Sequence, residues 1–409
     1  MSRGVPPGAT PGTPSVLRAM NDRTALELLL AHGPLTRARI GQLTGLSKPT
    51  ASQLLARLEA AGLVVADGTS EGGPGPQAQL WALNGAAGHA AALDVSPERT
   101  LAAVADLTGR VVGEAELPPA DGPIVSHVTA ALAAALADAG LDADAPHHLV
   151  IATPGAFDPR TGTLRYADHL PGWHSPTLLE EVAAALPMPV SYENDVNLAA
   201  LAERRRGAAR EHPDFVLLWN EAGLGAALVL GDRLHRGWTG GAGEVGFLPV
   251  PGHPLERQVA RRNTGGYQES AGSQVLPLLA AELGIAVPEV DAPTTEGRQV
   301  AAAVALLSDA AADPGGTGGR LLDAYATTLA TGLASVVAVL DPELVVLSGA
   351  VLAAGGEPLR ERLEAELGEL SPTRPRIVPG EITHRPVLGG ALETALAATR
   401  EDLFDTSRH

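Results

Sequence analysis

Residues 189–200 read PVSYENDVNLAA, a pattern that predicts a short strand running directly into a helix. The polar pair Asn194-Asp195 falls at the junction, where a side-chain oxygen can cap the helix. Apolar strands recur on both sides, at residues 149–152 and 215–218, with alanine-rich helical segments between strands. Strands that alternate with helices predict an α/β fold.

This α/β pattern extends from residue 86 to residue 400 and divides into two similar halves. The first half contains a long alanine-rich helix at residues 124–139, and the second half begins near residue 215. Late in the second half, a buried strand at residues 344–347 leads into Ser348-Gly349-Ala350. Two α/β halves with a cleft between them are a common place for a small ligand.

The charge divides the chain into a short basic part and a large acidic part. In total, 29 Lys and Arg against 47 Asp and Glu give a net charge of −18, which argues against a nucleic-acid partner. Residues 1–66, however, hold seven basic and three acidic residues, so a basic module precedes an acidic body.

The composition also excludes several classes of site and of protein. The chain has no cysteine, which excludes disulfides, thiol nucleophiles and cysteine-ligated metal sites. The first residues contain no apolar leader, and the most apolar later stretch, residues 324–340, is too short to span a bilayer comfortably. These features favour a soluble, cytoplasmic protein without a membrane partner.

Residues 14–85 have the pattern of a winged helix-turn-helix domain. A first helix is expected to end near Gly33, and Thr36 can cap a short second helix. Ser47 can cap a third helix that carries Pro49 in its first turn, where a missing N–H costs nothing. This is helix-turn-helix spacing.

Two strands, at residues 63–65 and 79–83, are expected to follow, joined by a wing rich in Gly, Ser and Pro. The alternative interpretation is a helical hairpin that only packs on the body or on a partner. The terminal position, the local basicity, the two caps and the wing favour DNA binding.

The third helix exposes short polar and basic side chains on the face opposite its apolar stripe. In a major groove, Thr50 and Gln53 would read base edges. Lys48, Arg57 and the helix N-terminus would hold phosphates. The candidate DNA-contacting residues are Ser47, Lys48, Pro49, Thr50, Ser52, Gln53 and Arg57.

Several short motifs follow one another in the acidic body. They are TPGAFD at 153–158, LPGW at 170–173, ENDVNLAA at 193–200, GLGA at 223–226, and RG at 236–237 followed by GAGEVG at 241–246. In this order they resemble the ROK family, which combines repressors, open reading frames and sugar kinases. The resemblance extends from about residue 14 to about residue 398, because a winged module before this body is the layout of the family's transcriptional repressors.

The resemblance implies an actin-like ATPase fold of two ribonuclease-H-like lobes that bind a sugar in the cleft. In the family's kinases, the Asp of the Asn-Asp pair is the general base that deprotonates the sugar hydroxyl, and here that residue is Asp195. His169 stands where relatives often carry Asn, and a plain surface histidine is the alternative for it. The candidate sugar-binding residues are Asn194, Asp195, Glu244, Glu269, His169 and Gly155.

The phosphate-binding motifs of the family's kinases depart from their pattern here. The Asp-x-Gly-x-Thr turn is replaced by residues 94–100, where glycine is missing and Pro97 removes an N–H donor. Glu221 places a carboxylate in the second phosphate turn, and like charges at short range repel. Ser348-Gly349-Ala350 stands where a Gly-Gly pair is usual. We therefore expect no ATP binding and no enzymatic activity, with Asp195 as a binding residue and only a vestigial base.

The family's zinc site is missing from the sequence as well. Phe247 stands in place of its histidine, and Ala260, Arg262 and Tyr267 in place of its three cysteines. We expect no metal and no other cofactor. Packing by Phe247 and Tyr267 would take over the stapling role, and the loss of the metal-bound loop weakens the assignments of Glu269 and, less so, Glu244.

These observations favour a DNA-binding transcriptional regulator, most simply a repressor of carbohydrate uptake or catabolism genes, controlled by a sugar or sugar phosphate. A homodimer or homotetramer on a palindromic operator is expected. One alternative is a sugar kinase that kept a DNA-binding module, and another is a regulator whose cleft no longer binds ligand. Short tails are predicted at residues 1–13 and 401–409.

Overall fold

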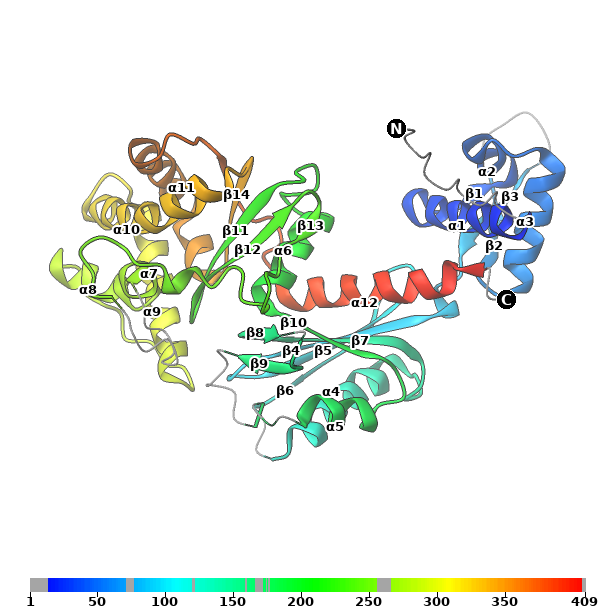
Figure 1. Ribbon diagram of the computed structural model, residues 1–409, viewed down its shortest axis with the longest axis horizontal. Helices are drawn as coiled ribbons and strands as arrows, with labels where there is room; N and C mark the ends of the chain where they lie inside the picture. The colour runs from blue at the N-terminus through cyan, green and yellow to red at the C-terminus, as the bar shows by residue number, and fades with distance from the viewer. Residues whose placement is uncertain are drawn as a thin grey trace, which may run out of the picture.

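The computed structural model describes residues 14–70, 77–119, 122–158, 160–165, 172–173, 175, 177–255 and 266–406. It has three parts: a winged module at the N-terminal end, a first lobe and a second lobe (Figure 1). A long helix, α12 (Pro386–Phe404), drawn in red, runs from between the lobes to the module. The predicted α/β architecture with a preceding winged module is confirmed.

The winged module contains the three helices and the two strands that its sequence predicts, and a short strand that was not predicted, β1 (Leu35–Thr36), completes a three-stranded sheet. Ser47 caps the third helix by accepting from Thr50 N–H, and Thr36 caps the second by accepting from Arg39 N–H. Gly45 has φ 72°, a value that favours glycine, at the turn between these helices. The elements are α1 (Pro14–His32), α2 (Arg37–Thr44), α3 (Lys48–Ala60), β1 (Leu35–Thr36), β2 (Val64–Thr69) and β3 (Gln79–Leu83), in the sheet order β1-β3-β2.

The first lobe is built on a five-stranded sheet in the order β10-β7-β4-β5-β6. Its strand β5 is buried along its whole length, because helices cover both faces of the sheet. The elements are η1 (Gly85–Ala87), β4 (His89–Val95), β5 (Thr100–Asp106), β6 (Val111–Leu117), α4 (Ile124–Ala139), β7 (Pro146–Thr153), β8 (Ala156–Asp158), β9 (Thr163–Arg165), α5 (Leu178–Ala185), β10 (Val190–Asn194) and α6 (Asp195–Arg206).

The second lobe repeats this plan with a sheet in the order β13-β12-β11-β14-β15. Strand β14 lies parallel to β11 and is fully buried, as its run of apolar residues predicts. The elements are β11 (Phe215–Asn220), β12 (Leu224–Leu230), β13 (Arg233–Leu234), η2 (Val245–Phe247), α7 (Gly266–Ala271), α8 (Val275–Glu282), α9 (Thr295–Ala312), α10 (Thr317–Leu340), β14 (Leu344–Ser348), α11 (Ala350–Leu370) and β15 (Arg376–Pro379).

Helix α10 is the most apolar long helix in the described part of the chain, with a mean hydropathy of 1.4 over its best window. It is long enough to cross a bilayer, but its side chains form much of the core of the second lobe. Leu321, Tyr325, Leu329 and Leu333 are each no more than 1% exposed. We therefore interpret α10 as a core helix.

Helix α12 joins the lobes to the winged module. Near its start it packs closely on α6, where Gly390 leaves no room for a side chain against the backbone of Leu198. At its end Phe404 is 2% exposed and belongs to the apolar core of the winged module, together with Leu26 and Leu58. The prediction of a tail from residue 401 is therefore wrong, because α12 continues to Phe404 and buries it.

Polar contacts hold the same junction together. Arg23 of α1 donates to both carboxylate oxygens of Glu401, at 2.8 and 2.6 Å. Asp402 accepts from His148 of β7 at 2.7 Å, which ties the end of α12 to the first lobe as well. The winged module is thus anchored to one end of a helix whose other end lies between the lobes (Figure 1).

Candidate functional site

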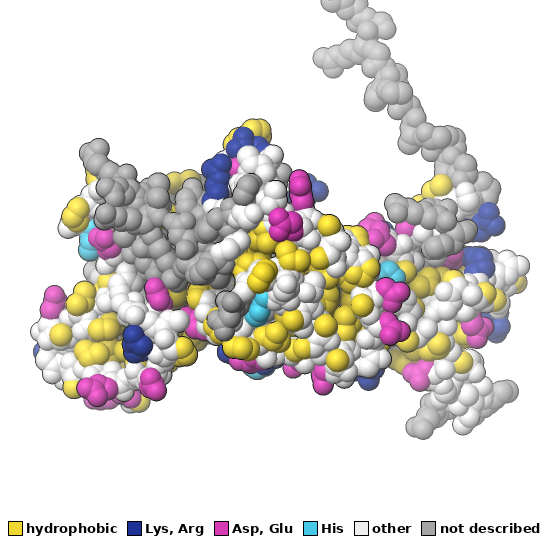
Figure 2. Space-filling model, turned by 90° about the horizontal axis from the view of Figure 1, so that it is seen from below, with side chains coloured by type: hydrophobic (Ala, Val, Ile, Leu, Met, Phe, Trp, Pro, Cys, Tyr) yellow, Lys and Arg dark blue, Asp and Glu magenta, His cyan; other side chains and the backbone are white. Residues whose placement is uncertain are grey.

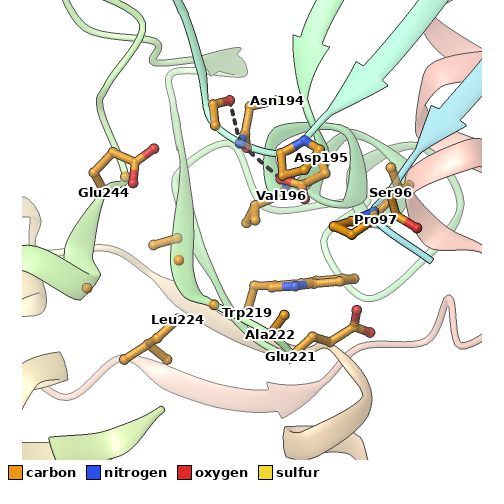
Figure 3. A pocket seen from close by; sticks show the side chains of 18 of the residues that line it. Ser96, Pro97, Asn194, Asp195, Val196, Trp219, Glu221, Ala222, Leu224 and Glu244 are labelled. Carbon is orange, nitrogen blue, oxygen red and sulfur yellow. Dashed lines mark hydrogen bonds between the residues drawn. The ribbon is translucent and has the colours of Figure 1, made fainter. Parts of the chain in front are cut away.

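A cavity of about 500 Å³ lies between the two lobes. The first lobe contributes the end of β4, the turn that follows it and the start of α6, and the second lobe contributes the turn between β11 and β12 and the residues before η2. Figure 3 shows Asn194 and Asp195 facing Trp219 and Glu221, with Glu244 to one side. Val387, near the start of α12, also lines the cavity.

Asn194 and Asp195 are fixed by the junction between β10 and α6. The Asn194 carboxamide oxygen accepts from Asn197 N–H at 3.0 Å and so caps α6, while its nitrogen donates to Gly155 O at 3.1 Å and to Asp195 Oδ1 at 3.0 Å. Asp195 Oδ1 also accepts from Val196 N–H at 2.8 Å. This pair therefore caps α6 and also lies on the cavity wall, and among the described residues the second Asp195 oxygen has no hydrogen-bond partner.

Four carboxyl groups on the cavity wall have raised pKa values because they are buried. Burial raises the pKa of Asp195 to about 8, and the pKa values of Glu221 and Glu244 to about 7. Burial also raises the pKa of Asp94 to about 6, although Arg99 opposes this shift. Such groups suit hydrogen bonds with the hydroxyls of a ligand, which would replace the water lost on burial.

The ligand-free protein should be more stable at pH 6 than at pH 8. A buried acid has a higher pKa in the folded protein than in the unfolded chain, where it is about 4. Between these two pKa values, the free energy of unfolding decreases as the pH rises. For Asp195 the interval ends near pH 8. The melting temperature of the wild-type protein should rise as the pH is lowered from 8.5 to 6. In the Asp195→Asn variant this rise should be smaller. A melting temperature that falls steadily over this range would contradict the assignment.

Glu221 caps the N-terminus of α11. Its Oε1 accepts from Ala350 N–H at 3.1 Å, directly after Gly349 at φ 86°. Free N–H groups and the helix dipole make such an N-terminus a natural anion site. Here a carboxylate of the protein itself takes up that site.

The side chain of Ser96 closes the turn between β4 and β5 by hydrogen bonds to the backbone of Arg99. Ser96 Oγ donates to Arg99 O at 3.0 Å and accepts from Arg99 N–H at 3.2 Å. Pro97, which has no N–H, lies on the cavity wall in this turn. Glu98 reaches across the cleft, where its Oε1 accepts from Thr294 Oγ1 at 3.0 Å.

Four of the six predicted sugar-binding residues lie on the cavity wall: Gly155, Asn194, Asp195 and Glu244. Glu269 does not line the cavity; its side chain is exposed, and its neighbour Gln268 faces the cavity instead. Successive helical residues point about 100° apart, so a motif alignment that holds along the chain does not fix which side chain enters the cavity. His169 lies outside the described residues.

Trp219 and Gln268 are among the wall residues that were not predicted from the sequence. The indole of Trp219, at the end of β11, is 7% exposed and borders the cavity. Gln268 accepts from Leu224 N–H at 2.6 Å and so joins α7 to β12. An aromatic residue at the end of a strand, directly before a glycine-containing turn, was the available signal for Trp219.

Tyr267, at one of the family's cysteine positions, is fully buried. Its hydroxyl donates to Leu329 O at 2.7 Å, and its ring lies against Gly332 of α10. Phe247 is partly buried in η2. Ala260 and Arg262 lie outside the described residues, and within the described part of the chain no three His, Cys, Asp or Glu side chains are grouped to hold a metal.

The exposed face of α3 carries the predicted DNA-contacting residues. Lys48 and Gln53 are exposed, and within the described ranges their side chains make no hydrogen bond. Ser52 accepts from Arg37 at 3.0 Å, and Ser47 and Thr50 are joined through their hydroxyls at 2.8 Å. Pro49 is exposed in the first turn.

Arg57 is engaged within the winged module. Its guanidinium lies 2.6 Å from Asp22 of α1, whose other carboxylate oxygen accepts from Thr406 at 3.2 Å. Nothing in the sequence pattern of α3 alone indicates this ion pair. A phosphate contact by Arg57 would have to share the guanidinium with Asp22.

Basic side chains are visible on the winged module, at the right of the view from below, and carboxylates are spread over both lobes (Figure 2). This distribution agrees with the sequence, in which the basic excess is confined to residues 1–66. Contact with a polyanion is thus favoured at the module and opposed at the lobes.

Comparison with protein-family models gives two matches. The ROK family model matches residues 90–397, and the MarR family model matches residues 21–71. The first covers both lobes and the second covers the helices of the winged module. Together they account for most of the described chain.

Known proteins similar to this chain include regulators and kinases. A putative xylose repressor of Caldicellulosiruptor sp. (strain Rt8B.4) is 25% identical over 58% of this chain and 61% of its own length. A glucokinase of Thermotoga maritima is 27% identical over 54% of this chain and 70% of its own length. The crystal structure of a ROK family transcriptional regulator, a homologue of the E. coli MLC protein, has a TM-score of 0.70 at 20% identity, covering 95% of this chain and 97% of its own. The chain matches about three fifths of the repressor's length, and the structural likeness concerns the fold.

Proposed function

Because this chain belongs to the ROK family, we propose that it is a DNA-binding transcriptional regulator, a repressor of carbohydrate uptake or catabolism genes that senses a sugar in the cavity between its lobes. The name of the similar repressor from Caldicellulosiruptor supports a role of this class. A regulator of this kind would act in the cytoplasm, where its operator is.

The observation that carries the proposal is the path of α12. Val387 borders the cavity at one end of this helix, and Phe404 lies in the core of the winged module at the other. A ligand that favours one arrangement of the lobes would therefore move the end of α12 that is packed in the winged module. The ligand must prefer that arrangement by a few kcal/mol to change operator occupancy substantially.

A symmetric dimer or a tetramer with two winged modules would match a palindromic operator. In that arrangement Thr50 and Gln53 read bases, and Lys48 contacts phosphates. The acidic lobes would keep the rest of the molecule away from DNA.

Replacing Gln53 by alanine should weaken binding to the cognate operator by roughly 1–3 kcal/mol and leave nonspecific binding unchanged, because a base contact is lost but no phosphate contact. Electrophoretic mobility shift with the operator and with a scrambled duplex measures both. Lys48→Ala is the matched comparison, since losing a phosphate contact should weaken both complexes alike and reduce the salt dependence. Equal losses for the two duplexes with Gln53→Ala would contradict the assignment.

We further propose that the protein is not a kinase and uses neither ATP nor zinc. Three features support this: the carboxylate of Glu221 at the N-terminus of α11, the missing N–H at Pro97, and the replacement of the family's zinc ligands. The similarity to a glucokinase keeps the kinase alternative open to test.

Incubation of the purified protein with ATP, Mg²⁺ and a panel of monosaccharides should therefore release no ADP above the rate without sugar. A coupled ADP assay measures this, with a sugar kinase as positive control. Sugar-dependent ADP release that disappears with Asp195→Asn would establish the kinase instead.

A further inference from the structure

The wall of the cavity is predominantly acidic. Five carboxyl side chains line the cavity in the described part of the chain, against one basic side chain, Arg99. A guanidinium nitrogen of Arg99 also lies 3.9 Å from a carboxylate oxygen of Glu116 in β6. Carboxyl groups from both lobes therefore face a ligand, and they are Asp94, Glu98, Asp195, Glu221 and Glu244.

These carboxyl groups differ in whether the protein supplies a hydrogen-bond donor to them. Asp195, Glu221 and Glu98 each accept a hydrogen bond from the protein. Asp94 on the first lobe and Glu244 on the second have no side-chain hydrogen bond within the described ranges, although both are mostly buried. A ligand that donates hydrogen bonds to both lobes would complete this site.

Two places on the wall that could hold a phosphate are already used by the protein itself. Phosphates bind to free N–H groups at helix N-termini and in glycine-rich turns. The N–H of Ala350 is bound to Glu221, and the turn at Pro97 is closed by Ser96. A phosphate brings acceptors and negative charge to a wall that already has both.

We propose that the effector of this regulator is an unphosphorylated sugar, and that a sugar with a protonated amine binds more tightly than the neutral sugar of the same shape. The proposal rests on the sugar-sensing function above and specifies the ligand of that same cavity. An ammonium group donates hydrogen bonds and attracts the carboxylates, whereas a phosphate ester is repelled by them. Hydroxyl groups donate to the same acceptors without the attraction between charges.

The test compares matched ligands on the full-length protein. Glucose, mannose and galactose are each compared with the 2-amino sugar, its N-acetyl form and the 6-phosphate, by thermal shift and then by calorimetric titration. In the series that binds, we expect the amino sugar to bind at least fivefold more tightly than the parent sugar. We expect the 6-phosphate to bind at least tenfold more weakly.

Charge is separated from size by isosteric variants. Glu221→Gln keeps an acceptor for Ala350 N–H and removes the charge, so it should reduce the discrimination against the 6-phosphate severalfold. Glu282→Gln, on the exposed face of α8 outside the cavity, is the matched control and should change nothing. Discrimination that Glu221→Gln leaves unchanged would assign it to size and overturn the charge argument.

The remaining outcomes separate this proposal from the function on which it rests. A 6-phosphate that binds as tightly as its parent overturns the proposal and leaves sugar sensing intact. An N-acetyl sugar that binds more tightly than the amino sugar overturns the preference for an amine. If none of the sugars binds while the operator is bound, sugar sensing itself fails, and the proposal with it.

Discussion

Asp195→Asn should abolish the response to sugar and leave operator binding unchanged within about twofold. Asp195 lies on the cavity wall at the start of α6, where one carboxylate oxygen accepts from Val196 N–H and the other has no hydrogen-bond partner among the described residues. Asparagine can keep the first of these bonds and the shape of the side chain, so α6 should remain folded. Above pH 8, where the Asp195 carboxyl is ionised, the lost interaction is a charged acceptor for a sugar hydroxyl, worth about 1.5–3 kcal/mol, or roughly 10- to 100-fold in affinity.

Two measurements decide this prediction. Calorimetric titration gives the affinity for the sugar, and a mobility shift with and without the sugar gives the response. Asp144→Asn, at an exposed position between α4 and β7, is the control for loss of one charge. If operator binding by the Asp195→Asn variant responds to the same sugar concentration as that of the wild type, Asp195 does not contact the ligand.

Gly390→Ala should destabilise the protein by about 1–3 kcal/mol, a large fraction of the stability of a typical fold. A Cβ atom at this position would overlap the carbonyl of Leu198 in α6, and a backbone atom cannot move aside as a side chain can. α12 would have to shift away from α6, which carries Asp195 at its start. We therefore also expect the coupling between sugar and operator to weaken in this variant.

The adjacent glycine provides a matched control for this prediction. At Gly389, a Cβ atom would meet only the guanidinium of Arg206, at 3.0 Å, which is the far end of a flexible side chain. Gly389→Ala should therefore be neutral or stabilising by up to about 1 kcal/mol, since alanine favours a helix over glycine. Urea denaturation of both variants measures the difference, and equal free energies of unfolding would contradict close packing between α12 and α6.

Features that depend on neighbours in the sequence were predicted well. The helix expected at residues 124–139 has the same bounds as α4, and Thr36 and Ser47 cap the two helices assigned to them. Hydrophobic periodicity and caps act over a few residues, so one sequence is enough to recognise them. The same holds for Asn194, whose capping role follows from its place between a strand and a helix.

Features that depend on distant residues were not predictable in this way. The burial of Phe404 requires Leu26 and Leu58, which lie in the first part of the chain. The ion pair of Arg57 requires Asp22 on another helix, and the cap of α11 requires Glu221 from the turn after β11. Periodicity contains no information on such pairs, because they form only once the elements are packed together.

The place of Phe404 has a consequence for synthesis of the protein. The core of the winged module includes a side chain that lies about 320 residues after the end of β3, the last strand of the module. A ribosome adds roughly 5–20 residues per second, so the module emerges at least some 15 seconds before the residue that completes its core. We infer that the core of the winged module is completed only after both lobes have been translated.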